Sequence, residues 1–204
     1  MGARGGVRVI GLTGPVAGGK SAAAKLLAAR GARVIELDAV GHRLLADPEV
    51  REEINAVFRE AADTEDLGEL RRRLAGIVFA DDAALSRLEH ILHGRMCAEV
   101  RREVEALRAA GRPALAVIAG ALVFEMGLDE LCEAVVLVDA PREERLRRAR
   151  AERGWDEAEV DRRESKQLPL TAKRLRAGRV VDNSGSREQL AAAMAAIWEE
   201  FGCQ

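Results

Sequence analysis

The chain has no tyrosine, two tryptophans and four phenylalanines among 204 residues. This scarcity argues against a surface that stacks the bases of single-stranded nucleic acid on aromatic rings. The formal net charge is −2, which argues against a protein that coats nucleic acid through an excess of positive charge. We therefore expect no nucleic-acid partner.

Cysteine is also scarce. Cys97, Cys132 and Cys203 are odd in number and form no C-x-x-C pair, which argues against a disulfide framework and against a cysteine zinc site. No apolar stretch approaches the length that spans a membrane, and residues 1–9 lack the apolar core of a secretory signal. The sequence predicts a cytoplasmic protein with no membrane partner, and we expect a monomer or a weak homo-oligomer.

Short apolar runs alternate with helical segments along the chain. Residues 7–13 are typical of a buried strand, the alanine-rich segment after residue 20 is typical of a helix that ends at Gly31, and residues 32–37 are typical of a second strand. This strand–helix–strand unit predicts a parallel sheet. The further expected elements are strands at 113–120, 133–140 and 179–183 and a closing helix at 186–201.

Two longer helical stretches interrupt this alternation, at residues 42–110 and 141–176. The first is too long for one crossover connection and predicts an inserted helical subdomain. The second is dense in arginine. The predicted fold is a single α/β domain over residues 1–204, a three-layer α/β/α sandwich with a parallel sheet and a helical insertion.

Residues 14–21, Gly-Pro-Val-Ala-Gly-Gly-Lys-Ser, fit the pattern G-x-x-x-x-G-K-[S/T] of the phosphate-binding P-loop. Glycines let successive backbone N–H groups turn inward around an anion, and the following helix points its positive end at the same anion. In such a loop the lysine reaches the β- and γ-phosphates and the serine hydroxyl coordinates Mg²⁺. The predicted nucleotide-binding residues are Gly14, Pro15, Val16, Ala17, Gly18, Gly19, Lys20, Ser21 and Ala22.

Residues elsewhere in the chain indicate which class of P-loop protein this is, because each class has its own accompanying motifs. No lysine follows an asparagine, so the guanine-reading motif of GTPases is missing, and the third predicted strand ends VIAG without an acidic residue. Another carboxylate must therefore act, and Asp38 is the best candidate, because it closes the second strand at the sheet edge where ligands of open α/β sheets gather. It could accept the proton of an alcohol. It could equally be the N-cap of the next helix.

Four segments, the first of which contains the P-loop, give the chain a more specific resemblance. They are GLTGPVAGGKSAAAKLLAARGARVIELDAVGH (11–42), LRRRLAGIVFADDAALSRLEHILHGRM (70–96), ALVFEMGL (121–128) and VVDNSG (180–185), the last preceded by Gln167. In order and spacing they resemble the dephospho-coenzyme A kinase family, from about Val9 to Leu190.

The resemblance implies transfer of phosphate from ATP, with Mg²⁺, to the ribose 3′-hydroxyl of dephospho-coenzyme A. It implies that residues 42–110 hold this small-molecule acceptor and that residues 141–176 form a lid over the phosphates. Carried over by position, the candidate catalytic residues are Lys20, Asp38, Arg148 and Arg153, with Ser21 toward the metal and Asn183 near the adenine. The candidate acceptor-binding residues are Asp38, His42, His93 and Glu125.

Some of these assignments have plainer alternatives. The arginines at 147, 148, 150 and 153 span two helical turns, so some must face solvent and pair with nearby glutamates, although a phosphoryl-transfer lid needs one or two of them. His90 and His93 are spaced to share a metal, but no further ligand pattern completes a zinc site, so His93 is either structural or, as the resemblance implies, an acceptor contact. His42 could equally be an exposed helix residue.

Some positions depart from the family pattern and describe a divergent member. They are Pro15, Ala22, Glu36, Gly94, Ala121 and Gly178. Two alternatives to the implied function therefore stay open. One is a P-loop kinase for another small alcohol or nucleotide, and the other is a nucleotide-binding regulator without catalysis.

Overall fold

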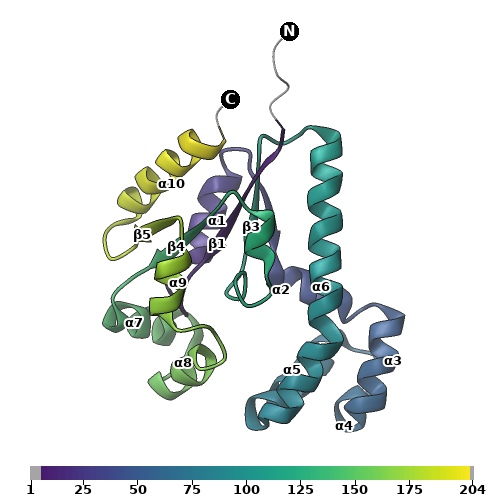
Figure 1. The fold of residues 1–204 in the computed structure, drawn as a ribbon. Helices are drawn as coiled ribbons and strands as arrows, with labels where there is room; N and C mark the ends of the chain where they lie inside the picture. Colours follow the sequence, from purple (N-terminus) through teal and green to yellow (C-terminus); the bar gives the residue numbers. More distant parts are fainter. Residues whose placement is uncertain (1–5, 203–204) are drawn as a thin grey trace. The chain divides into compact units, whose positions relative to one another are not determined.

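The computed structural model of the chain describes residues 6–202, apart from the side chains of Ala62 and Phe79 (Figure 1). Two compact units are present. One combines the described residues up to Leu37 with those from Arg101 onward, and the other is Asp38–Val100.

The first unit contains a five-stranded sheet in the order β2-β3-β1-β4-β5, in which all neighbouring strands are parallel. The strands are β1 (Arg8–Thr13), β2 (Arg33–Glu36), β3 (Leu115–Ala119), β4 (Ala134–Asp139) and β5 (Arg179–Asp182). The predicted parallel sheet is therefore confirmed. β1 is the central strand, paired with β3 on one side and with β4 on the other. The loop that follows β1 therefore starts at the middle of the edge formed by the carboxyl ends of the strands.

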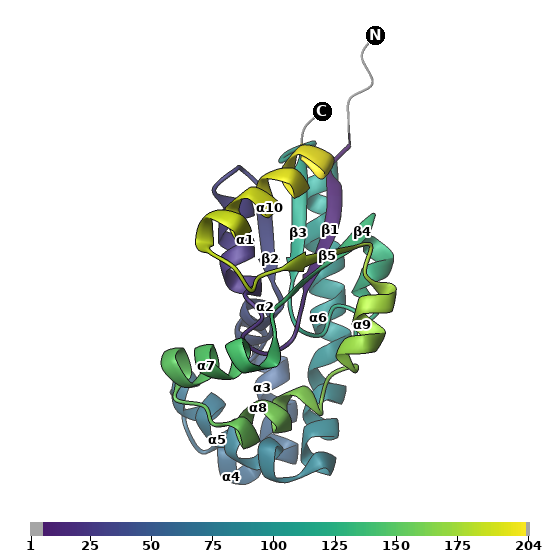
Figure 2. The ribbon, with the colours of Figure 1, turned by 90° about the vertical axis from the view of Figure 1, so that its left-hand side faces the viewer.

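Helices cover both faces of this sheet (Figure 2). α1 (Lys20–Ala28) and α10 (Arg187–Phe201) lie on one face, where Ile10 and Leu12 of β1 pack with Leu27 and Met194. The short helix η1 (Leu128–Leu131) and α9 (Leu170–Arg176) lie on the other. On that side a Cβ on Gly11 would lie 3.1 Å from a methyl group of Val123, so the absent side chain lets the connection after β3 approach β1.

Three helices follow β4 within the stretch 141–176. They are α7 (Arg142–Arg153), α8 (Glu157–Glu164) and α9. α8 starts at an Asp156 cap, whose carboxylate accepts the N–H of Glu159 at 2.8 Å. A small apolar cluster of Val16, Ala149 and Val160 joins α7 and α8 to the loop between β1 and α1.

The second unit is helical and has its own core. Its helices are α2 (Leu37–Leu44), α3 (Pro48–Val57), α4 (Arg59–Ala62), α5 (Leu67–Ala80) and the first part of α6 (Asp82–Ala110). Asp47 caps α3 and Asp66 caps α5 through their carboxylates. The buried residues include Val50, Ile54 and Leu70. The insertion predicted from the sequence spanned residues 42–110, whereas this unit spans Asp38–Val100 and α6 continues beyond Val100 to Ala110.

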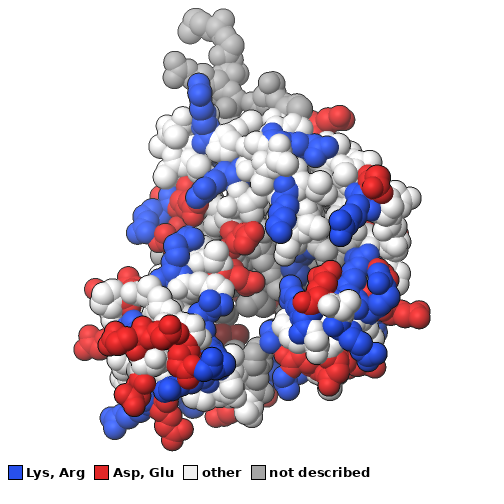
Figure 3. Space-filling model, turned by 180° about the vertical axis from the view of Figure 1, so that it is seen from behind, with Lys and Arg blue, Asp and Glu red and all other residues white. Residues whose placement is uncertain are grey.

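On the face drawn in Figure 3, basic and acidic side chains are interspersed. Among the helices formed within residues 6–202, none combines the length and the apolar character that a membrane crossing requires.

Candidate active site

The loop between β1 and α1 is shaped by its close contact with β4. A Cβ on Gly14 would lie 2.1 Å from the carbonyl oxygen of Val138, and one on Gly18 would lie 2.8 Å from the same oxygen. Gly19 has a φ of +105°, and its Cβ would lie 2.0 Å from Nδ2 of Asn183. Only glycine fits at these positions, which gives the spacing of the motif a steric reason.

The start of α1 is suited to an anion. Gly19 is its N-cap, no side chain caps it, and no acidic residue lies in its first turn. The first N–H groups of a helix have no partner within the helix, and its positive end favours negative charge. This is the arrangement that binds phosphate at helix starts in other proteins.

Lys20 folds its side chain back across the loop. Its Nζ donates to the carbonyl oxygens of Gly14 at 2.7 Å and Pro15 at 2.8 Å. The ammonium group therefore lies over the backbone that would surround an anion. Ser21 is exposed in the first turn of α1, where its hydroxyl is available to a metal ion.

Asn183 supports the loop from the end of β5. Its side chain is buried, and Nδ2 donates to the carbonyl oxygen of Gly18 at 2.9 Å. Its backbone N–H donates to the carbonyl oxygen of Asp139 at 2.7 Å. The residue thus joins the loop to the ends of β4 and β5. That Asn183 also borders the adenine stays a prediction.

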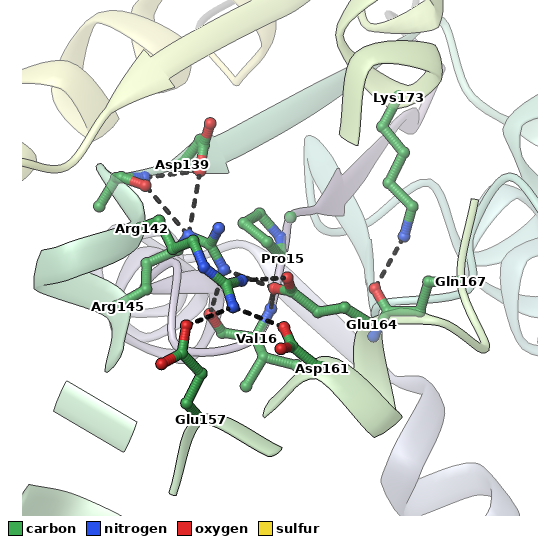
Figure 4. Close-up of polar contacts among 12 residues, drawn as sticks. Pro15, Val16, Asp139, Arg142, Arg145, Glu157, Asp161, Glu164, Gln167 and Lys173 are labelled. Carbon is green, nitrogen blue, oxygen red and sulfur yellow. Dashed lines mark hydrogen bonds and ion pairs between the residues drawn. The ribbon is translucent and has the colours of Figure 1, made fainter. Parts of the chain in front are cut away.

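An ion pair between a buried arginine and a half-buried glutamate holds the loop from the side of α7 and α8 (Figure 4). Arg145 of α7 places Nη1 at 2.5 Å from Oε1 of Glu164 of α8. The same Glu164 oxygen accepts the backbone N–H of Val16 at 3.0 Å. Neither Arg145 nor Glu164 was predicted from the sequence as a site residue. The one feature of the sequence that could have indicated the burial of Arg145 is its position one helical turn before Ala149, which places it on the same helix face as a small apolar residue.

The first unit therefore combines a glycine-rich loop with the P-loop sequence pattern and a parallel sheet of the order 2-3-1-4-5. A family model described as dephospho-CoA kinase matches residues 8–189. The chain belongs to the dephospho-CoA kinase family.

Similar proteins cover nearly the whole chain. The dephospho-CoA kinase of Corynebacterium diphtheriae is 39% identical over 97% of this chain and 99% of its own length, and that of Anaeromyxobacter dehalogenans is 42% identical over 91% and 88%. The crystal structure of the Thermus thermophilus protein TT1252 superposes with a TM-score of 0.79 at 36% identity, covering 96% of this chain and 98% of that one. The dephospho-CoA kinase structure from Campylobacter jejuni has a TM-score of 0.66 at 18% identity, covering 99% and 100%, and shares the fold.

The family resemblance suggested Arg148 and Arg153 as lid arginines, and the two side chains differ in burial and in contacts. Arg148 is half-buried, donates from Nη2 to the carbonyl oxygen of Asn183 at 2.8 Å and pairs with Glu144. Arg153 is exposed, and its guanidinium lies 4.7 Å from the ring centre of Trp155. Arg148 thus contacts the segment that supports the loop, whereas Arg153 packs at the end of α7. Their roles in phosphoryl transfer stay predictions.

Glu125 belongs to a buried polar cluster in the first unit. Its Oε1 lies 3.0 Å from Nζ of Lys173 and accepts the N–H of Leu168 at 2.8 Å. Lys173 also donates to Ala121 O at 2.6 Å and to Gln167 Oε1 at 3.0 Å. The cluster joins α9 to the segment after β3. Acceptor binding by Glu125 stays a prediction, and the contacts give this carboxylate a structural partner that the sequence did not indicate.

The remaining candidates lie in the helical unit. Asp38 is exposed in the first turn of α2, two residues after β2 ends, and the exposed His42 follows one turn later. Partial burial, followed by the charge of Arg71, lowers the pKa of His42, and Asp38 opposes this shift. His93 is half-buried in α6. Within residues 6–202, no three His, Cys, Asp or Glu side chains gather to hold a metal ion.

Proposed function

We propose that the protein transfers the γ-phosphoryl group of ATP to the ribose 3′-hydroxyl of dephospho-coenzyme A, giving coenzyme A and ADP. The observation that carries the proposal is the loop at residues 14–21, folded against β4 with Lys20 across it, in a chain that matches the dephospho-CoA kinase family over residues 8–189.

The loop and the start of α1 would hold the triphosphate. Backbone N–H groups around Gly18 and Gly19 bind the phosphate oxygens, and the Lys20 ammonium moves from the loop carbonyls to the β- and γ-phosphates. Mg²⁺ fits this site because Ser21 presents an exposed hydroxyl beside Lys20, and Mg²⁺ prefers oxygen ligands from one or two side chains together with phosphates. When bound, the ion neutralises charge that develops on the transferring group.

Asp38 would be the general base. In the transfer, the 3′-oxygen forms a bond to the γ-phosphorus while the bond from that phosphorus to the ADP oxygen breaks, and the hydroxyl proton passes to the Asp38 carboxylate. The helical unit, with His42 and His93, would hold the acceptor. Arg148 and Arg153 would neutralise the phosphates from the segment 141–176.

The acceptor is tested by a coupled assay of ADP release. We expect turnover with dephospho-coenzyme A and little with adenosine, AMP or pantetheine alone. Preference for another alcohol would favour the first alternative, a kinase for a different small molecule. ATP binding without turnover of any acceptor would favour the second, a regulator.

Asp38 is tested separately by Asp38→Asn, which keeps the size of the side chain but removes its basicity. We expect the turnover number to fall by about two to four powers of ten, as for loss of a general base, with ATP affinity retained. Lys20→Ala is the reference for loss of nucleotide binding. Near-normal turnover of Asp38→Asn beside an inactive Lys20→Ala would leave Asp38 as a helix-start residue only.

A further inference from the structure

Both backbone groups of Val16 are bound by one ion pair, between the buried Arg145 and the half-buried Glu164. Its N–H donates to Glu164 Oε1 at 3.0 Å, and its carbonyl oxygen accepts from Arg145 Nη1 at 3.3 Å. The two side chains are joined by the 2.5 Å contact between Nη1 and Oε1. These three contacts close a ring around a single residue of the P-loop (Figure 4). We name Arg145 and Glu164 the Val16 clamp.

The clamp is itself held firmly. Arg145 is almost wholly buried, with 5% of its side chain exposed, and its Nε donates to the carbonyl oxygen of Ala140 at 3.1 Å. The second oxygen of Glu164 lies 3.8 Å from Arg142. Each charge therefore has more than one partner, and the buried Arg145 in particular is compensated by a carboxylate and by backbone acceptors.

The residue after Val16 explains what the clamp could do. Ala17 has a φ of +55°, the only positive φ of a non-glycine residue in residues 6–202. The left-handed conformation is unfavourable for an L-residue with a Cβ, and it persists only where the surroundings hold it. Fixing both peptide groups of Val16 supplies this restraint next to Ala17.

The clamp also has an electrostatic role. A carboxylate bound to the loop backbone would repel the triphosphate that the loop receives. Arg145 offsets this charge at 2.5 Å, so that Glu164 can restrain Val16 without opposing the nucleotide.

We propose that Arg145 and Glu164 are positioning residues that hold the P-loop in its anion-binding conformation, by fixing Val16 and through it the left-handed Ala17. This inference deepens the proposed function and rests on its assignment of the loop to nucleotide phosphates. It does not depend on the identity of the acceptor.

The test measures binding of Mg²⁺·ADP to the full chain by titration calorimetry, without any acceptor. We expect Arg145→Met and Glu164→Ala each to weaken binding about tenfold, the scale of releasing one strained residue. Glu164→Gln keeps an oxygen acceptor for the Val16 N–H and should restore most of the affinity that Glu164→Ala loses. Arg150→Met is the matched control, because Arg150 is an exposed arginine of the same helix.

The decisive comparison repeats these variants with Ala17→Gly. Glycine adopts a positive φ without steric cost. Adding Ala17→Gly to Arg145→Met should therefore raise the affinity for ADP several-fold more than adding Ala17→Gly to the wild type does. A general loss of stability would not be repaired in this way. Equal gains in the two backgrounds, or unchanged ADP affinity in both Arg145→Met and Glu164→Ala, would overturn the proposal.

Circular dichroism first establishes that each variant is folded. Should Arg145→Met fail to fold, Arg145→Lys and Glu164→Ala decide by the same comparison, because lysine keeps the charge but cannot reach Glu164, Val16 and Ala140 together. Failure of this proposal can be told apart from failure of the proposed function, because one is measured by ADP binding and the other by phosphorylation of the acceptor. Wild-type protein that binds ADP but does not phosphorylate dephospho-coenzyme A would refute that function and leave the clamp standing.

Discussion

Replacing Lys173 with methionine should destabilise the protein strongly, because it leaves a carboxylate buried without its cation. Only 2% of the Lys173 side chain and 16% of the Glu125 side chain are exposed. Methionine keeps most of the apolar contacts of the lysine stem. The change therefore isolates the loss of the ammonium group, which binds Glu125, Gln167 and Ala121.

The expected size follows from this burial. Removing one partner of a buried ion pair costs roughly 3–5 kcal/mol, and the partial exposure of Glu125 places this pair at the lower end, about 3 kcal/mol. For a chain of this length, 1 kcal/mol shifts Tm by roughly 2–4 °C. The fall in Tm should therefore be about 6–12 °C.

Thermal unfolding followed by circular dichroism measures this change. The double variant Lys173→Met with Glu125→Gln removes both charges and keeps an acceptor for the Leu168 N–H, so it should recover most of the lost Tm. Lys25→Met replaces an exposed lysine of α1 and should shift Tm by no more than about 2 °C. If the double variant is no more stable than Lys173→Met, the unpaired Glu125 carboxylate is not the source of the lost stability.

Three further predictions concern the loop, the lid segment and the half-buried thiol of Cys132. Gly19→Ala should abolish ADP binding measured by calorimetry, because its Cβ would lie 2.0 Å from Nδ2 of Asn183; retained affinity would contradict the steric argument. Arg148→Ala or Arg153→Ala should lower kcat more than ATP affinity, and unchanged turnover in both would remove their assignment to the lid. Burial, followed by Asp129, raises the pKa of Cys132 to about 12. Its contribution to stability is therefore complete below the ordinary thiol pKa of about 8.5 and is lost as the pH rises toward 12, so urea unfolding between pH 8 and 11 should show a steeper loss in the wild type than in Cys132→Ala.

The sheet could be predicted from the sequence because each of its strands is marked by residues that are consecutive in the chain. Each buried strand is a short apolar run, and strands β1 to β5 begin and end within two residues of the predicted bounds. The P-loop was equally accessible, since glycine spacing, Lys20 and Ser21 lie within eight residues. The end of the helical unit at Val100 could not be predicted from the sequence, because α6 continues across this boundary without a change in helical periodicity.

The Val16 clamp shows why the rest of the site could not be predicted. α7 contains many arginines, and nothing in their spacing singles out Arg145. Its burial depends on the rotation of α7 about its axis, which is set by packing of Ala149 against Val16 and Val160. Likewise, Asp38 follows an apolar run that looked like a longer strand, but β2 ends at Glu36 and Asp38 lies in the first turn of α2.

The contact between Asn183 and Gly18 joins residues 165 positions apart. During synthesis the glycine-rich loop therefore leaves the ribosome 165 residues before the amide that contacts it. A nascent chain that stops before β5 should therefore retain no nucleotide on an ATP-analogue resin, and competence to bind should arise only after β5 and Asn183 have emerged.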